Sequence, residues 1–224
     1  TIRAMELHGG DKGVAHGVEN LRRHIRNVRD VLGVPCVVGL NRFAQDRAED
    51  VQIVKKACEE MGVICADNKA FLEGGAGASG LATAITQLLE SPEKVAIKPL
   101  LQMPEIGIRK KMEAISKHVY GATQVVVDPM VEALLAEFEA SDLAKLPVCM
   151  AKTPLSFSDN AEAGGLVGEH TLKVTGMRVS NGAGFVVALC GPIMTMPGLP
   201  ERPNAIDIHL NQDARVDFGR GSSK

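Results

Sequence analysis

Two phenylalanines, Phe43 and Phe71, lie just past short apolar runs, where an aromatic ring could stack on a flat ligand. Phe43 follows the run VVGLNR, and Phe71 follows VICADNKA. The chain has no Trp, one Tyr and six Phe, so an aromatic side chain in a loop is unusual here. In an open α/β sheet, ligands usually bind in the crevice beyond the carboxyl ends of the strands. The two rings therefore predict a sandwich for a flat heterocycle.

The loop that carries Phe43 also holds Asn41 and Asp46, two polar candidates for the same site. Its opening is similar to the N-K-x-D loop with which P-loop GTPases read guanine. Ala44 occupies the position of the base-reading Asp, and Asp46 comes two positions later. A guanine site is therefore disfavoured, and Asn41 and Asp46 remain candidates for binding another heterocycle.

Two further candidates stand next to glycines. Gly74 and Gly75 precede a predicted helix, and their backbone N–H groups could bind a carboxylate or a phosphate. A flexible turn that lets two segments pack closely is an equal alternative. His8 precedes Gly9-Gly10 at the end of a strand-like opening and is a possible site residue, although a single His is more often structural.

Lys152, in the sequence MAKT, could reach a phosphate, but a solvated lysine after a strand is the ordinary case. No G-x-x-x-x-G-K-[ST] sequence is present, so the chain lacks that cradle for ATP. No cluster of His, Cys, Asp and Glu has metal-ligand spacing. We therefore assign no metal site and no catalytic residue.

Strand and helix patterns alternate along the chain, which predicts a parallel sheet with flanking helices and right-handed crossovers. The fold class is α/β, followed by a smaller α+β region. We expect domains at 1–95 and 96–224, separated by a proline-rich break, and a frayed tail. The predicted helices are 16–32, 48–61, 79–89, 106–119 and 129–140; the predicted strands are 35–40, 63–66, 123–127, 146–151, 171–179 and 185–190, and the opening of the chain is also strand-like.

Composition narrows the class of protein. The formal charge of -2 gives no sign of a nucleic-acid surface, and no apolar run approaches the ~20 residues that cross a bilayer. Five cysteines without a CxxC pair fit a reducing compartment, so we expect a cytoplasmic protein. The sequence begins at TIRAMELHGG without an initiator Met, which suggests a piece of a longer chain.

Longer motifs carry a family resemblance. The segments LPVCMAKT, SFSD and GAGFVVALCGPIMTMPGLP closely resemble formate–tetrahydrofolate ligase, also called formyltetrahydrofolate synthetase. TIRAMELHGG, GVPCVVGLNRF and the Gly-Gly-x-Gly loop after Phe71 agree with that family in the same order. The resemblance extends from residue 1 to about residue 200.

The resemblance implies an ATP-dependent ligase of one-carbon metabolism that joins formate to tetrahydrofolate, usually as a homotetramer, with ATP bound together with magnesium. It implies a P-loop-NTPase-like ligase fold whose ATP-binding half is absent from this chain. This portion would supply the folate side, would need no cofactor of its own and would be inactive alone. The family holds the pterin ring between the Phe of an N-[RK]-F loop, here Phe43, and a Trp, here replaced by Phe71.

Departures from the family pattern gather in the same loops. The family reads F-P-T-D-T where this chain has Phe43, Ala44, Gln45, Asp46 and Arg47, so Asp46 is kept while the Pro and both Thr are not. The alternative interpretation is therefore a divergent, non-catalytic relative or fragment that keeps the fold without ligase activity.

Overall fold

The computed structural model describes residues 1–90, 97–98, 105–193, 202–206, 208–210, 212 and 216–217. The internal contacts of the chain divide it into two compact units, Thr1–Ile193 and Met194–Lys224. In the second unit, strand β7 (His209–Leu210) pairs antiparallel with β8 (Val216–Asp217), after a short 3-10 turn at Asn204–Ile206. The proline-rich break, the MTMPGLP segment and the predicted frayed tail fall largely or wholly outside the described residues.

The chain opens with a helix, α1 (Ile2–Gly9), and not with the predicted strand. The Thr1 hydroxyl caps the helix by accepting a hydrogen bond from the Ala4 N–H at 3.1 Å. The buried residues Ile2, Met5 and Gly9 are spaced three and four apart, which is the period of one helix face. The strand prediction was wrong because it missed this period and the cap.

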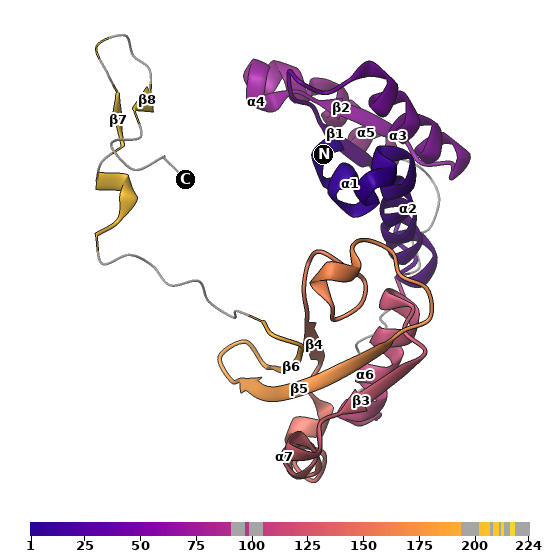
Figure 1. Cartoon of the computed structure of the whole chain (residues 1–224), viewed down its shortest axis with the longest axis vertical. Helices are drawn as coiled ribbons and strands as arrows, with labels where there is room; N and C mark the ends of the chain where they lie inside the picture. Colours follow the sequence, from indigo (N-terminus) through magenta and orange to yellow (C-terminus); the bar gives the residue numbers. More distant parts are fainter. Residues whose placement is uncertain are drawn as a thin grey trace. The chain divides into compact units, whose positions relative to one another are not determined.

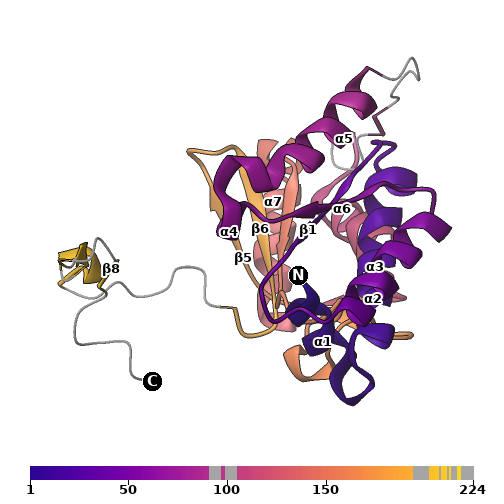
Figure 2. The ribbon, with the colours of Figure 1, turned by 90° about the horizontal axis from the view of Figure 1, so that it is seen from above.

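Helix α2 (Gly13–Arg26) lies alongside α1, and the two pack at very short range (Figures 1 and 2). A Cβ atom at Gly17 would stand 1.7 Å from the Met5 carbonyl oxygen, and one at Gly9 would stand 2.9 Å from the Gly17 nitrogen. Only glycine permits this approach. The predicted helix 16–32 is confirmed, with a π-helical end at Asn27–Val31.

The first sheet is parallel, as predicted. Strand β1 (Val38–Asn41) pairs with β2 (Cys65–Asn68), and Asn41 stands opposite Asn68. Helix α3 (Ala48–Glu60) connects them, which confirms the predicted crossover helix. Helix α4 (Ala70–Glu73) and a 3-10 turn (Gly74–Ala78) lead from β2 to α5 (Ser79–Leu89). Ser79 was expected to cap α5, but it is the first helical residue, and its hydroxyl donates to the Ala76 carbonyl.

The second sheet is mixed. Its strand order is β3 (Gln124–Val127), β5 (Thr171–Ser180), β6 (Phe185–Cys190) and β4 (Val148–Ala151). The pairs β3–β5 and β4–β6 are parallel, whereas β5 and β6 form an antiparallel hairpin. The expectation of a parallel sheet therefore holds for the first sheet and for two of the three pairings here.

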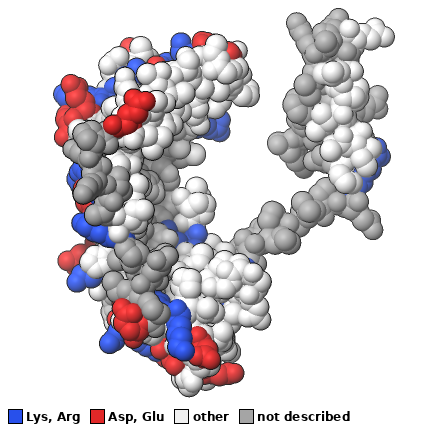
Figure 3. Space-filling view, turned by 180° about the vertical axis from the view of Figure 1, so that it is seen from behind, with Lys and Arg blue, Asp and Glu red and all other residues white. Residues whose placement is uncertain are grey.

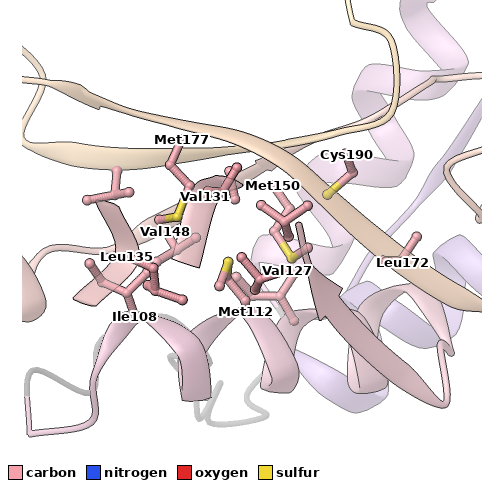
Figure 4. Close-up of a cluster of buried hydrophobic side chains, with 14 of the residues drawn as sticks. Ile108, Met112, Val127, Val131, Leu135, Val148, Met150, Leu172, Met177 and Cys190 are labelled. Carbon is pink, nitrogen blue, oxygen red and sulfur yellow. The ribbon is translucent and has the colours of Figure 1, made fainter. Parts of the chain in front are cut away.

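Two helices accompany the second sheet. Helix α6 (Ile108–Ile115) continues into a π-helical turn at Ser116–Tyr120. Helix α7 (Pro129–Glu139) begins as the sequence predicts, because the Asp128 carboxylate accepts from the Met130 N–H at 3.1 Å and Pro129 occupies the first turn. Figure 4 shows Ile108 and Met112 of α6 directed toward the strands.

Two clusters of buried apolar side chains form the core of the first unit, and they share no residue. One contains Ile2, Met5, Val14, Val18, Ile25, Leu40, Val51, Val54, Ala57, Cys58 and Val63. The other, drawn in part in Figure 4, contains Ile108, Met112, Ile115, Ala122, Val127, Val131, Leu135, Phe138, Val148, Met150, Leu172, Val174, Met177, Val186, Ala188 and Cys190. The domain boundary near residue 95 stays a prediction, although the clusters fall on either side of it.

The surface carries both signs of charge. On the face that Figure 3 shows, Lys and Arg side chains are intermingled with Asp and Glu, and no single basic stripe stands out. Within the described residues, no helix is long and apolar enough to cross a membrane.

Candidate functional site

The two phenylalanines that the sequence singled out are in contact. Because β1 and β2 are parallel and in register, the loops that follow them emerge at the same edge of the sheet. The ring centroids of Phe43 and Phe71 are 5.7 Å apart, and the ring planes are tilted by 49°. Phe43 is half-buried, whereas Phe71 is 81% exposed. An exposed aromatic side chain beside a second ring is a surface on which a flat ligand could stack.

Asn41 and Asp46 form hydrogen bonds that fix the conformation of this edge of the sheet. The Asn68 amide donates to the Asn41 side-chain oxygen at 2.8 Å, across the ends of the paired strands. Asp46 Oδ2 accepts the Phe43 N–H at 2.9 Å and lies 3.5 Å from Arg42 Nε. The Asp46 side chain is only 6% exposed, so its carboxylate is engaged in positioning Phe43 and not in free contact with solvent.

Charges behind the loop complete a small network. Arg42 Nη1 lies 3.0 Å from Asp67 Oδ2, and Lys55 Nζ lies 3.1 Å from the other oxygen of the same carboxylate. Arg42 therefore bridges Asp46, in the loop after β1, and Asp67, in β2. The sequence did not reveal this bridge, because Arg42 and Asp67 are 25 residues apart and form no motif.

Gly74 and Gly75 lie in the 3-10 turn between Phe71 and α5, and both are exposed. Gly74 has a φ of 60°, and a Cβ atom at Gly75 would meet nothing within 4 Å. The Lys69 N–H donates to the Gly77 carbonyl at 2.9 Å and closes the turn. This geometry fits a turn that lets two segments pack closely. The glycine that permits the close packing is Gly77, where a Cβ atom would stand 2.7 Å from the Lys69 backbone.

Pockets lie on both sides of α1. One of about 480 Å³ is lined by Phe43, Asp46 and Arg47 together with Thr1, Ile2, Arg3, Glu6 and Gln45. His8 does not line it. His8 stands in the last turn of α1, not at the end of a strand, and lines a separate pocket of about 260 Å³ with Asn20, His24 and Leu40. The structure therefore brings Asn41, Phe43, Asp46 and Phe71 together and leaves His8 apart.

A second polar cluster gathers beyond β4. Lys152, expected to be a solvated lysine, is half-buried instead. Its ammonium donates to the carbonyls of Thr153, at 2.9 Å, and Ser156, and stands 4.9 Å from the centre of the Tyr120 ring. Burial lowers the pKa of this ammonium. No carboxylate of the described residues is within ion-pair distance of it.

Helix α2 supplies the opposite wall of this cluster. Asn20 is 6% exposed, and its side-chain oxygen has no hydrogen-bond partner among the described residues. The His24 ring lies 5.0 Å from the buried Phe157 ring. The His24 side chain is exposed, but partial desolvation beside its neighbours lowers its pKa, and the nearby charges of His8, Lys152 and Arg23 lower it further. The ring is therefore held neutral at neutral pH.

The lowered pKa of His24 predicts a pH-dependent stability. The folded state binds fewer protons than the unfolded state, so the free energy of unfolding decreases as pH falls through about 6.5, the unfolded pKa of histidine. Because the His24 side chain is exposed, solvent screens this effect, and we expect His24→Gln to flatten the fall of the urea midpoint between about pH 7 and pH 5 only slightly. His16→Gln, an exposed histidine of the same helix, is the control. An unchanged slope in His24→Gln would contradict the prediction.

Among the described residues, no group of three or more His, Cys, Asp or Glu could hold a metal ion. The candidate site is therefore an aromatic pair at the carboxyl edge of a parallel sheet, braced by a carboxylate and flanked by a pocket. This is an α/β fold with aromatic and polar side chains beyond the carboxyl ends of its parallel strands, the place where ligands of such folds commonly bind.

Comparison with known proteins gives the family. The family model "Formate--tetrahydrofolate ligase" matches residues 1–218, and the chain belongs to that family. It is 41% identical to the formate–tetrahydrofolate ligase of Nocardioides sp. over 226 residues, 40% identical to that of Hyphomonas neptunium and 37% identical to that of Methylococcus capsulatus. These alignments cover 96% or 97% of this chain but only 40% of each relative. The chain thus spans about two fifths of the length of these relatives.

Proposed function

We propose that this chain supplies the tetrahydrofolate side of a formate–tetrahydrofolate ligase. The observation that carries the proposal is the contact between Phe43 and Phe71 at the carboxyl edge of β1 and β2, in a member of this family. A pterin is flat and aromatic, and it would replace the ring-to-ring contact with two stacked faces.

The rings must separate to admit a ligand. A flat ring held between two others needs about 3.5 Å on each side, so the outer rings must stand about 7 Å apart and nearly parallel. They are 5.7 Å apart and tilted by 49°. Phe71, which is 81% exposed, is free to swing outward, whereas the loop of Phe43 is held by Asp46. We infer that Phe71 is the ring that moves and Phe43 is the fixed face.

The other parts of the activity rest on the family. We propose that ATP with magnesium, and formate, bind in the part of the protein that this chain lacks, which has a P-loop-NTPase-like fold. The two-fifths coverage of the relatives and the absence of an ATP-binding loop from the sequence support this division. This chain alone would then be inactive, and the complete protein would be a cytoplasmic homo-oligomer. Asn41, Asp46, Gly74 and Gly75 would shape the pterin site.

Replacing Phe43 by alanine tests the proposal. We expect Phe43→Ala to weaken tetrahydrofolate binding by about 1–3 kcal/mol, because one stacking face is lost. The measurement is calorimetric titration of tetrahydrofolate, with this chain alone and with this chain fused to the part of the Nocardioides sp. ligase that it lacks.

Met130→Ala is the matched control, because it truncates a side chain that is 91% exposed on α7. Equal affinities for Phe43→Ala and Met130→Ala would remove Phe43 from the site. If the unchanged fusion takes up no tetrahydrofolate at all, the chain is instead a divergent relative that keeps the fold without the ligand.

A further inference from the structure

The pocket beyond β4 is built from segments far apart in the sequence. It encloses about 340 Å³, within the range of pockets that hold small ligands, and none of its lining residues lines the pocket beside Phe43. Asn20 and His24 come from α2, Tyr120 from the turn after α6, and Lys152 and Phe157 from the segment after β4. Asn20 and His24 also line the smaller pocket beside His8, so the two cavities meet at these side chains.

Lys152 brings a positive charge to the pocket that no ion pair among the described residues balances, although the Asp159 carboxylate acts on it from a longer distance. Its ammonium is half-buried, and its partners in the described part of the chain are two carbonyl oxygens and the face of Tyr120. Carbonyl dipoles orient an ammonium but do not neutralise it. A half-buried cation without an ion-pair partner at contact distance attracts an anion, and a carboxylate can form a charge-assisted hydrogen bond with its third N–H.

The Asn20 side-chain oxygen is a second, independent group of this pocket that lacks a hydrogen-bond partner in the described part of the chain. Asn20 lines both cavities, and its side-chain oxygen is buried and accepts no hydrogen bond from the described residues. A buried acceptor left without a donor costs about 1–3 kcal/mol, so such atoms normally have a partner. An N–H group on a bound molecule would satisfy it.

The remaining walls are aromatic or apolar. The Phe157 ring lies 5.0 Å from His24 and 6.4 Å from Tyr120, so the three rings form one cluster, and all three residues line the pocket. Met150 and Pro154 complete the apolar lining. Such walls favour a flat, unsaturated body between the charged end and the donating end of a ligand.

We propose that this pocket binds an aromatic carboxylate that also carries an N–H donor. The carboxylate pairs with the Lys152 ammonium, the N–H donates to the Asn20 side-chain oxygen, and the aromatic body lies against Tyr120 and Phe157. No covalent step is involved. The proposal does not depend on tetrahydrofolate binding at Phe43.

Three probes of one shape test the proposal. 4-Aminobenzoate has both groups, benzoate lacks the donor, and 4-aminobenzamide lacks the charge. Tyr120 is the one tyrosine of the sequence, so ¹³C-tyrosine labelling gives a single ring signal that reports from this pocket. We expect 4-aminobenzoate to shift that signal and to bind about tenfold or more tightly than 4-aminobenzamide and several-fold more tightly than benzoate. Equal binding of the amide and the acid, or no shift with any probe, would overturn the proposal.

Two variants test which side chain binds each polar group of the ligand. Asn20→Leu should abolish the preference for 4-aminobenzoate over benzoate while benzoate still binds. Lys152→Gln should weaken both acids about tenfold or more, whereas Lys173→Gln, whose ammonium is exposed and pairs with Asp128 at 3.0 Å, should not. If Lys152→Gln fails to fold, the probe series on the unchanged chain and on Asn20→Leu still decides. Equal loss in Lys173→Gln, or an undiminished preference in Asn20→Leu, would exclude this site.

Discussion

Leu172→Ala is expected to destabilise the chain by about 2–5 kcal/mol, because Leu172 is fully buried in the core of the second sheet. It lies on β5 opposite Val125 of β3, and the packed side chains of the core around it prevent the cavity from closing. The measurement is urea unfolding followed by circular dichroism.

The matched control is the same substitution on the surface. Leu89 ends α5 and is 79% exposed, so Leu89→Ala should change the free energy of unfolding by no more than about 0.5 kcal/mol. Similar effects at the two positions would show that β5 is not enclosed as described.

Gly17→Ala is expected to destabilise the packing of α1 on α2 by about 3 kcal/mol. The new methyl group would stand 1.7 Å from the Met5 carbonyl oxygen, and a backbone atom cannot move aside as a side chain can, so the helices must separate. This steric cost exceeds the roughly 1 kcal/mol by which alanine favours a helix over glycine.

Gly80→Ala separates these two effects. Gly80 lies in α5, and a Cβ atom there would meet nothing within 4 Å. We expect this substitution to be neutral or to stabilise the chain by up to about 1 kcal/mol. The same substitution should therefore have opposite signs in the two helices, measured as shifts of the urea midpoint. A stabilising Gly17→Ala would contradict the close packing.

The sequence predicted most elements because their periods were clear. The apolar spacing of α2 and α3 and the Asp128-Pro129 start of α7 were sufficient. The direction of β5 relative to β6 was not predictable in the same way, because buried runs look alike in parallel and antiparallel pairs. The opening helix was missed because its buried face holds few apolar residues.

The sequence also indicated one of the two candidate sites. Neighbouring parallel strands must end at one edge, so the sequence placed Phe43 and Phe71 near one another; it expected both in loops, whereas Phe71 lies on the short helix α4. The pocket at Lys152 was not predictable, because α2, the turn at Tyr120 and the segment after β4 are brought together only by tertiary packing. An isolated Lys and an isolated Asn carry no spacing signal.

The junction between the two apolar cores is largely polar. The Val119 carbonyl accepts hydrogen bonds from Asn27 at 2.9 Å and from Arg23 at 3.2 Å, and Arg23 also donates to the His118 carbonyl. Each such bond contributes only about 1 kcal/mol net, whereas each core encloses many apolar side chains. The cores are therefore weakly coupled and should melt as separate cooperative units. A single melting temperature would then average two events, and heat could unfold one core while the other stays folded.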